Sequence, residues 1–132
     1  MVGIFLSKSN NVRKDSKYCL ELEDGGYYWY LVPYFEKITE ETGQWIELYE
    51  IAVFFQDDLD SLSKGLNEAK DSINDKPNEW KVSVGIQIHP GNKKKELFYL
   101  GNKEKMLEII DKLLQITKEA KEQNLYLIFF GD

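Results

Sequence analysis

The sequence predicts an α+β fold, in which about three helices pack against a mixed or largely antiparallel sheet. Short apolar or alternating segments, typical of strands, are separated by polar turns, and most neighbouring strands are close enough to form hairpins. Three longer segments repeat apolar residues every three or four positions, as amphipathic helices do. The 132 residues suit one domain, residues 1–132, with a single core.

The N-terminal part of the chain predicts two strands and a turn. Val2–Leu6 is a short, continuous apolar run followed by a polar cluster, which is typical of a buried strand. Lys17–Glu23 alternates as a half-buried strand does, and every second residue from Tyr18 to Leu22 should share one face. Asp24–Gly26 should form a turn in which the glycines supply positive φ.

The first helix is expected in the aromatic stretch that follows. Apolar residues recur at helical spacing from Tyr27 onward, but Pro33 would kink a helix there or mark its first turn. The pattern therefore predicts a helix from about Pro33 to Thr42 and leaves residues 27–32 open. Gly43 is well placed to end this helix in the left-handed conformation.

A strand and a second helix come next. Trp45–Phe55 is rich in β-branched and aromatic residues and predicts a strand, with a bulge or bend after Tyr49, where the apolar phase changes. Gln56–Asp58 offers an N-cap, and apolar residues at three- and four-residue steps predict a helix from Asp58 to about Asn74. Acidic residues in its first turn suit the positive end of the helix dipole.

The C-terminal half predicts a hairpin, a helix and a strand. The hairpin pairs a strictly alternating strand, Trp80–His89, with Glu96–Leu100 across a turn at Pro90–Asn92. Asn102 should cap a long helix that covers about residues 103–123. The last strand is Leu125–Phe130. Because residues 51–55 and 125–130 are continuously apolar, we expect both strands in the centre of the sheet.

The charge of the chain is negative and unevenly spread. The net charge is −6, and residues 36–75 alone hold eleven Asp and Glu against three Lys. Such a surface is unsuited to direct binding of nucleic acid or an anionic membrane, because both ligands are themselves negative. A basic protein partner fits better, since complementary potentials accelerate encounter. The alternative is that the acidic residues only keep the protein in solution.

Two features of the sequence predict a cytoplasmic protein. The single cysteine, Cys19, forms no internal disulfide and suggests a reducing compartment. The apolar run Val2–Leu6 is too short for a signal sequence, and no stretch approaches the roughly 18 apolar residues that span a bilayer.

No catalytic or metal-binding constellation is apparent. Cys19 has no activating neighbour in its predicted strand, and His89, the one histidine, is expected at the surface beside a turn. The lysines at 93–95 should be solvated at the hairpin tip. The run Asp57–Asp60 lacks the glycine and the later glutamate of a calcium loop. We therefore expect no enzyme, no cofactor and no metal site.

A protein-binding surface is the remaining candidate. Residues 27–55 hold ten of the eighteen aromatic residues, too many for one face of a small core, so some should be exposed. Exposed Tyr and Trp beside carboxylates favour binding of a basic partner. The alternative is that the aromatic residues all pack inside or contact a second copy of the chain. The candidate partner-binding residues are Glu40, Glu41, Trp45, Glu47, Tyr49, Glu50, Asp57, Asp58 and Asp60.

Four segments carry a resemblance to a known group of proteins: YYWYLVPYFEKITEETGQWIELYEIAVFF (27–55), LDSLSKGLNEAKDSI (59–73), PNEWKVSVGIQI (77–88) and IFFGD (128–132). Together they resemble small acidic bacterial immunity proteins of polymorphic toxin and contact-dependent growth inhibition systems. The resemblance implies an antidote that binds a cognate toxin domain, commonly a nuclease, with an acidic surface in place of the phosphates of nucleic acid. Immunity families share no binding motif, so it assigns no partner residues.

Two other classes of function stay open. The chain is alternatively a structural or regulatory interaction module, for example a homodimer that uses the aromatic stretch 27–55 as its interface. A small enzyme with carboxylate chemistry is the third hypothesis, but acidic pairs such as Glu40–Glu41 are too common in this sequence to indicate one.

Overall fold

The described residues form three helices and six strands, which confirms the predicted α+β class. This computed structural model describes the backbone of residues 1–89 and 93–132, and the side chains of residues 1–83 and 97–132. The elements are, in chain order, β1 (Val2–Ser7), β2 (Lys17–Leu22), α1 (Gly26–Thr42), β3 (Ile51–Phe54), α2 (Asp57–Ile73), β4 (Glu79–His89), β5 (Lys93–Asn102), α3 (Lys103–Gln123) and β6 (Tyr126–Gly131).

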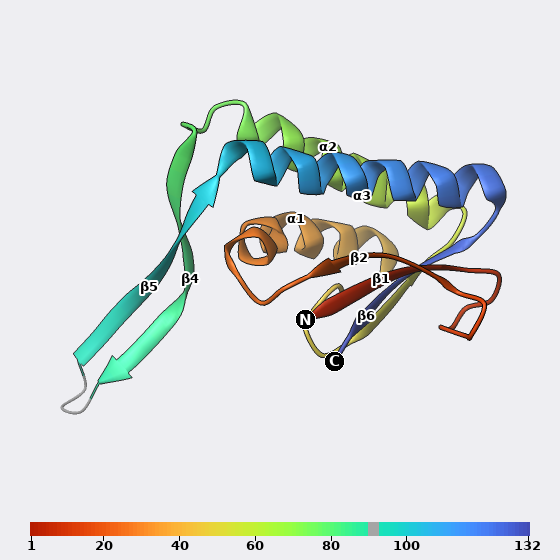
Figure 1. Cartoon of the computed structure of the whole chain (residues 1–132), viewed down its shortest axis with the longest axis horizontal. Coiled ribbons are helices and arrows are strands. Elements are labelled where there is room, and N and C mark those ends of the chain that lie inside the picture. Colours follow the sequence, from red (N-terminus) through yellow and green to blue (C-terminus); the bar gives the residue numbers. More distant parts are fainter. Residues whose placement is uncertain (90–92) are drawn as a thin grey trace.

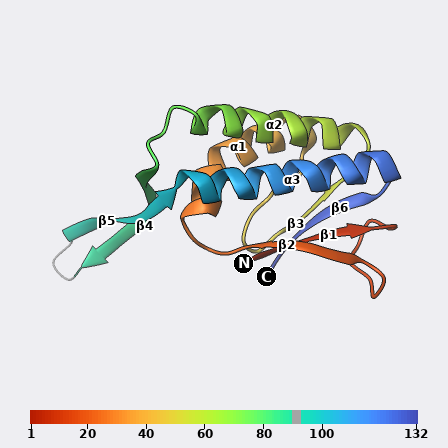
Figure 2. The ribbon, with the colours of Figure 1, turned by 45° about the horizontal axis from the view of Figure 1, so that its top comes forward.

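The main body is one antiparallel sheet with all three helices on the same side of it (Figures 1 and 2). The strand order is β2-β1-β6-β3. Helix α2 packs against both α1 and α3. Strands β4 and β5 form a separate two-stranded sheet, which projects from the body as an arm (Figure 1). No helix of the described chain lies on the opposite face of the main sheet.

An aromatic cluster joins the sheet to the first helix. Phe129 of β6 lies with its ring centre 5.5 Å from that of Phe54 in β3 and 6.4 Å from that of Phe35 in α1, in both cases edge to face. All three side chains are almost fully buried. Such pairs add roughly 0.5–1.5 kcal/mol beyond the burial of their area. This cluster fixes where α1 lies on the sheet.

The prediction of two central apolar strands is half right. Strand β6 lies between β1 and β3, but β3 is at the edge of the sheet. Its free edge is covered by a side chain, since the backbone N–H of Val53 donates to Oε1 of Gln44 at 2.8 Å. Only some of the apolar residues of β3 are therefore buried: Ala52 and Phe54 are buried, whereas Ile51 is 53% exposed.

Strand β2 differs from its predicted alternation because it contains a bulge. Ile4 pairs with Leu20 and the next residue, Phe5, pairs with Tyr18, so Cys19 is the extra residue. Beyond the bulge the faces reverse. Tyr18, expected on the face of Leu20, lies on the opposite face, where it packs edge-on against Phe5 with ring centres 5.5 Å apart.

Helix α1 begins before Pro33, which answers the question that the sequence left open. The carbonyl of Gly25 accepts the N–H of Trp29 at 3.1 Å, and the helix continues through Pro33. The predicted positive φ at the preceding glycines is wrong, because Gly25 has an extended backbone with φ −162°. Gly43 ends the helix with φ 75°, as predicted, and donates its N–H to Thr39.

The other helix ends and the hairpin follow the sequence closely. The side chain of Asn102 accepts the N–H of Lys105 at 3.0 Å, which confirms the predicted cap of α3. Gln56 occupies the N-cap of α2 without a side-chain hydrogen bond, and the predicted acidic residues fill the first turn. The hairpin forms as expected with a longer β5, but its register shifts between Ser83 and Gly85, which interrupts the predicted strict alternation.

Substitution of Phe129 by Ala should lower the free energy of unfolding by about 3–5 kcal/mol, because it removes the centre of the aromatic cluster. Phe130→Ala is the matched control: the neighbouring ring points to the other side of the sheet and is 38% exposed, so it should cost about 1 kcal/mol or less. Urea unfolding measures both, with Phe129→Leu as the milder variant if the alanine variant does not fold. Equal costs at the two positions would contradict this packing.

Candidate functional site

Residues 44–50 form an irregular segment that is held against α1 and the end of the sheet. The Thr39 hydroxyl donates to the carbonyl of Gln44 at 2.8 Å, and the Gln44 side chain in turn accepts from Val53 at 2.8 Å. At the other end, the N–H of Gly131 donates to the carbonyl of Glu50 at 2.8 Å. These bonds hold both ends of the segment in place and satisfy the carbonyls of Gln44 and Glu50.

The 44–50 segment alternates in burial although it is not a strand. Ile46 and Leu48 are buried beneath it, whereas Trp45 is 58% exposed and Tyr49 is 75% exposed. The predicted strand over 45–55 is therefore confirmed only for 51–54. The prediction that some aromatic residues of the stretch are exposed is confirmed by Trp45 and Tyr49, and the alternative that all of them pack inside is wrong.

A groove of about 270 Å³ lies between the 44–50 segment and α1, and we call it the α1 groove. The helix contributes Trp29, Val32 and Glu36 to its lining, and the segment contributes Trp45, Glu47 and Tyr49 among others. A further hollow of about 480 Å³ extends it past Trp45 to Glu40. The site thus combines an apolar floor with carboxylates at its rim.

Ionisation of the tyrosine in the lining of the α1 groove, Tyr28, is unfavourable. Burial raises the pKa of the Tyr28 phenol, which lies in the lining of the groove, and the neighbouring carboxylates of Glu47 and Asp24 raise it further. Tyr28 therefore stays neutral, and the groove presents the negative charge of its glutamates alone.

The structure brings together four of the nine candidate residues: Glu40, Trp45, Glu47 and Tyr49 line the α1 groove and its extension. Glu50 follows Tyr49 and is exposed, but it is not part of the lining. Glu41 lies toward α2 instead, where its carboxylate pairs with Lys64 at 3.3 Å.

The acidic start of α2 does not belong to this groove. Asp57, Asp58 and Asp60 follow β3, whose four residues span roughly 13 Å, whereas Tyr49 precedes that strand. Asp60 lies 3.0 Å and Asp57 3.9 Å from the ammonium group of Lys121 in α3. The sequence could not reveal this pairing, because Lys121 lies 61 residues beyond Asp60 along the chain.

One stripe of α1 residues lines the groove and its extension: Trp29, Val32, Glu36 and Glu40, which follow one another at three- and four-residue steps. The nine candidates from the sequence include only Glu40 of this stripe and omit the other three. This stripe was visible in the sequence once a helix was assumed across Pro33. Trp29 is held in place by Asp24, whose carboxylate accepts the indole N–H at 2.9 Å.

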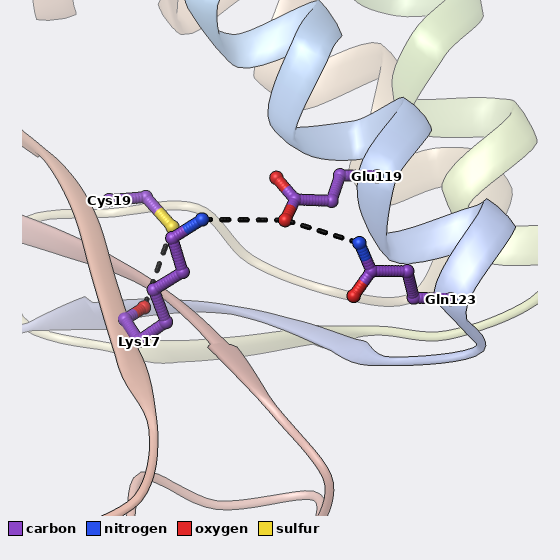
Figure 3. Close-up of polar contacts among 4 residues, drawn as sticks. All are labelled: Lys17, Cys19, Glu119 and Gln123. Carbon is purple, nitrogen blue, oxygen red and sulfur yellow. Dashed lines mark hydrogen bonds and ion pairs between the residues drawn. The ribbon is translucent and has the colours of Figure 1, made fainter.

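Cys19 lies beside α3 in a small polar cluster (Figure 3). Its thiol donates to the carbonyl of Lys17 at 3.4 Å, and the ammonium group of Lys17 is 3.3 Å from Glu119, which also accepts from Gln123 at 3.4 Å. Burial raises the pKa of the Cys19 thiol despite the nearby charge of Lys17. A raised pKa disfavours the thiolate that a nucleophile needs.

Other candidate chemistry is limited to what the structure describes. Among residues 1–83 and 97–132, no three Asp, Glu, Cys or His side chains are grouped so that they could hold a metal ion. The predictions for His89 and for the lysines at 93–95 concern side chains that lie outside the described residues. Over the described chain, none of the helices combines the length and the apolar character needed to cross a bilayer.

Comparison with models of known protein families, with curated proteins and with solved structures finds no match to this chain. The resemblance to immunity proteins therefore stays a prediction, and a function has to be inferred from the α1 groove.

The pKa of the Cys19 thiol should be higher than that of a free thiol, because burial disfavours the charged thiolate. The pH dependence of alkylation by iodoacetamide measures this, with a small unhindered thiol as reference. Glu119→Gln should lower the midpoint, since it removes a negative neighbour, and Lys17→Gln should raise it. A midpoint at or below that of the reference thiol would contradict the arrangement.

Gly131→Ala should destabilise the protein by about 1–3 kcal/mol and displace the 44–50 segment. A Cβ at this position would lie 2.5 Å from the carbonyl oxygen of Glu47 and 2.7 Å from that of Glu50, so the backbone of the segment must move. Gly25→Ala is the control, because nothing lies within 4 Å of its Cβ position and its backbone is extended. Urea unfolding measures the loss of stability, and the emission of Trp45 reports the displacement of the segment. An unchanged segment in Gly131→Ala would refute the contact.

Proposed function

We propose that this protein is an immunity protein, which binds a basic toxin domain such as a nuclease through the α1 groove and neutralises it without catalysis. The observation that carries the proposal is the exposure of Trp45 and Tyr49 beside the glutamates of the groove. Tyr and Trp are the residues most often found at the energetic centre of protein interfaces. Their position at a concave, acidic surface supports a positively charged protein as the ligand.

The pairing of the acidic residues supports the same conclusion. Outside the groove, Glu41, Asp57, Asp60 and Glu68 each lie within 4.0 Å of a lysine ammonium group, so their charge is partly neutralised within the chain. The groove carboxylates Glu36, Glu40 and Glu47 have no ion-pair partner among the side chains that the structure describes. Their charge is therefore free to attract an external cation.

The proposed mode of inhibition follows from this charge. A toxin that cleaves nucleic acid needs a basic surface to hold the phosphates. Carboxylates at the rim of the α1 groove would take the place of those phosphates, while Trp45 and Tyr49 supply apolar contact. Bound in this way, the immunity protein blocks the access of substrate to the toxin.

Self-association is the second candidate, and one observation favours it. Ile51 and Phe130 are directly paired across β3 and β6, and they are 53% and 38% exposed. They add an uncharged apolar area beside the end of the 44–50 segment. Two copies joined through the α1 groove, however, would face each other with unpaired glutamates, which repel. A basic partner is the better fit to the groove.

Affinity capture from the source cell at low salt should recover a basic protein in stoichiometric amount, which elutes as the salt concentration rises. The double variant Trp45→Ala/Tyr49→Ala should bind that protein at least about 30-fold more weakly, the loss expected for one hot-spot residue. Asp57→Asn/Asp60→Asn is the matched control and should bind nearly as the wild type does, because these carboxylates already pair with Lys121.

The captured protein should also stop growth when it is expressed alone in a bacterial host, and co-expression with this chain should restore growth. Equal binding by the Trp45/Tyr49 variant and the wild type would show that the α1 groove is not the interface. Recovery of the bait alone, together with a mass in solution that doubles with concentration, would favour the homodimer instead.

A further inference from the structure

A second groove adjoins the α1 groove at the root of the hairpin arm. This hairpin-root groove has a volume of about 620 Å³ and is lined by the end of β2, the first turn of α1, residues 98–99 of β5, and Lys105 and Ile109 of α3. Tyr28 and Trp29 line both grooves, so the two are neighbours at the first turn of α1. Together with the extension toward Glu40, these hollows accompany α1 from its first turn to Gly43, and we call them the joined groove.

Negative charge is concentrated along this joined groove. Six carboxylates line its three parts, against one lysine, Lys105, in the described chain. They are Glu21, Glu23, Asp24, Glu36, Glu40 and Glu47. None of the six has an ion-pair partner among the described side chains.

The hollows on the other sides of α1 are different. The one between α1 and α2 contains Lys37 and Lys64, each paired with a glutamate. The one beside β4 contains Lys76 and Lys81 and a single carboxylate, Asp75. Glu40 also lines the hollow between α1 and α2, and Asp75 has no ion-pair partner among the described side chains, but each of these two hollows contains two lysines. Unpaired carboxylates are therefore most numerous along the joined groove.

Trp29 lies where the two grooves meet, and its ring is fixed before any ligand arrives. The indole N–H donates to Asp24 at 2.9 Å, and the ring packs edge-on against Tyr28 with centres 5.3 Å apart. A fixed aromatic face between carboxylates suits a guanidinium group, which can stack on the ring and pair with an acid at the same time. Because the ring is already ordered, binding loses little side-chain entropy there.

The dimensions of the joined groove suit an extended chain. Helix α1 has 17 residues and is therefore roughly 26 Å long. An extended peptide advances about 3.3 Å per residue, so about eight residues would cover that length. A hollow that accompanies the whole helix suits such a segment.

We infer that the joined groove along α1 binds an extended, arginine- or lysine-rich segment of about eight residues, with Trp29 near its middle. The inference rests on the proposed function, because it names the part of the basic partner that enters the groove. The cationic side chains pair with the six carboxylates, and their aliphatic stems lie on Trp29 and Trp45.

Fluorescein-labelled octa-arginine, titrated with the full-length protein at low salt and followed by anisotropy, tests the inference directly. We expect saturable binding of one peptide per chain, at least about tenfold tighter than that of tetra-arginine, since the longer peptide reaches both grooves. Octa-glutamate should not bind. Equal affinity for tetra- and octa-arginine, or no binding of octa-arginine, would overturn the continuous groove.

Two triple variants separate a local site from general electrostatic attraction. Glu21→Gln/Glu23→Gln/Glu47→Gln removes three carboxylates of the joined groove, and Glu41→Gln/Asp57→Asn/Asp60→Asn removes three that pair with lysines elsewhere. Both change the net charge equally. We expect the first to weaken octa-arginine binding at least about tenfold and the second less than about threefold. Equal weakening by both variants would mean attraction to the overall charge and no site.

Trp29→Ala should weaken octa-arginine binding about five- to thirtyfold relative to the wild type. This is the range expected for a desolvated contact between a cation and an aromatic ring. Trp29→Phe keeps an aromatic face without the indole N–H and serves if the alanine variant does not fold. In the double variant Trp45→Phe/Trp80→Phe, Trp29 is the sole tryptophan, and its emission should change on binding. Unchanged emission at saturation would overturn the central place of Trp29.

The two proposals fail in different ways. If capture of a basic protein depends on Trp45 and Tyr49 but octa-arginine does not bind, the proposed function stands and the extended segment is wrong. If octa-arginine binds with the variant pattern above but no basic protein is captured or neutralised, the groove stands and the role as an immunity protein is wrong.

Discussion

The contact between Phe35 of α1 and Phe129 of β6 is the constraint on which the other features depend. It places α1 on the sheet, and Phe54 of β3 packs edge to face against the same Phe129 ring. Every groove described above has α1 as one wall. Since the interior of a protein is close-packed, a shift of this helix would move all of these walls together.

Helix α1 also supports the root of the hairpin arm. Trp80 of β4 packs edge-on against Tyr30 with ring centres 5.4 Å apart, and Tyr99 of β5 packs against Tyr27 at 5.6 Å. A two-stranded hairpin is marginally stable by itself, so these contacts determine how the arm leaves the body. The same contacts place Tyr99 at the edge of the hairpin-root groove, which links the arm to the candidate binding surface.

In the described chain, carboxylates that pair with lysines and the unpaired carboxylates of the joined groove lie on different parts of the surface. Lysines on α1, α2 and α3 partly neutralise the carboxylates around the helical layer, for example Lys70 with Asp111 at 2.6 Å and Lys121 with Asp60 at 3.0 Å. Exposed pairs of this kind contribute little to stability. Their consequence is electrostatic: the six carboxylates along the joined groove have no ion-pair partner among the described side chains, so they keep their negative potential.

The apolar spacing in the sequence correctly predicted those elements in which the buried residues recur at the period of a helix or a strand. The helix over 103–123 with its Asn102 cap, and the strands at 2–6 and 125–130, are close to what the apolar spacing indicates. Errors arose where a local pattern fits two structures. The alternation of residues 45–50 resembles a strand, but no ladder forms. The carbonyl of Glu50 accepts from Gly131, and the other end of the segment is held through Gln44, which bonds to Thr39 and Val53.

Composition and local periodicity were enough to predict the fold class, three helices apart from the start of α1, and more aromatic residues than the core can hold. Which acidic residues act together depends on the folded chain. Lys121 and Lys64 lie far along the chain from the carboxylates that they neutralise, and Asp24, Glu36 and Glu47 come from three separate segments. Pairing of charges across helices and the meeting of grooves at Trp29 depend on packing between distant segments, which no local pattern encodes.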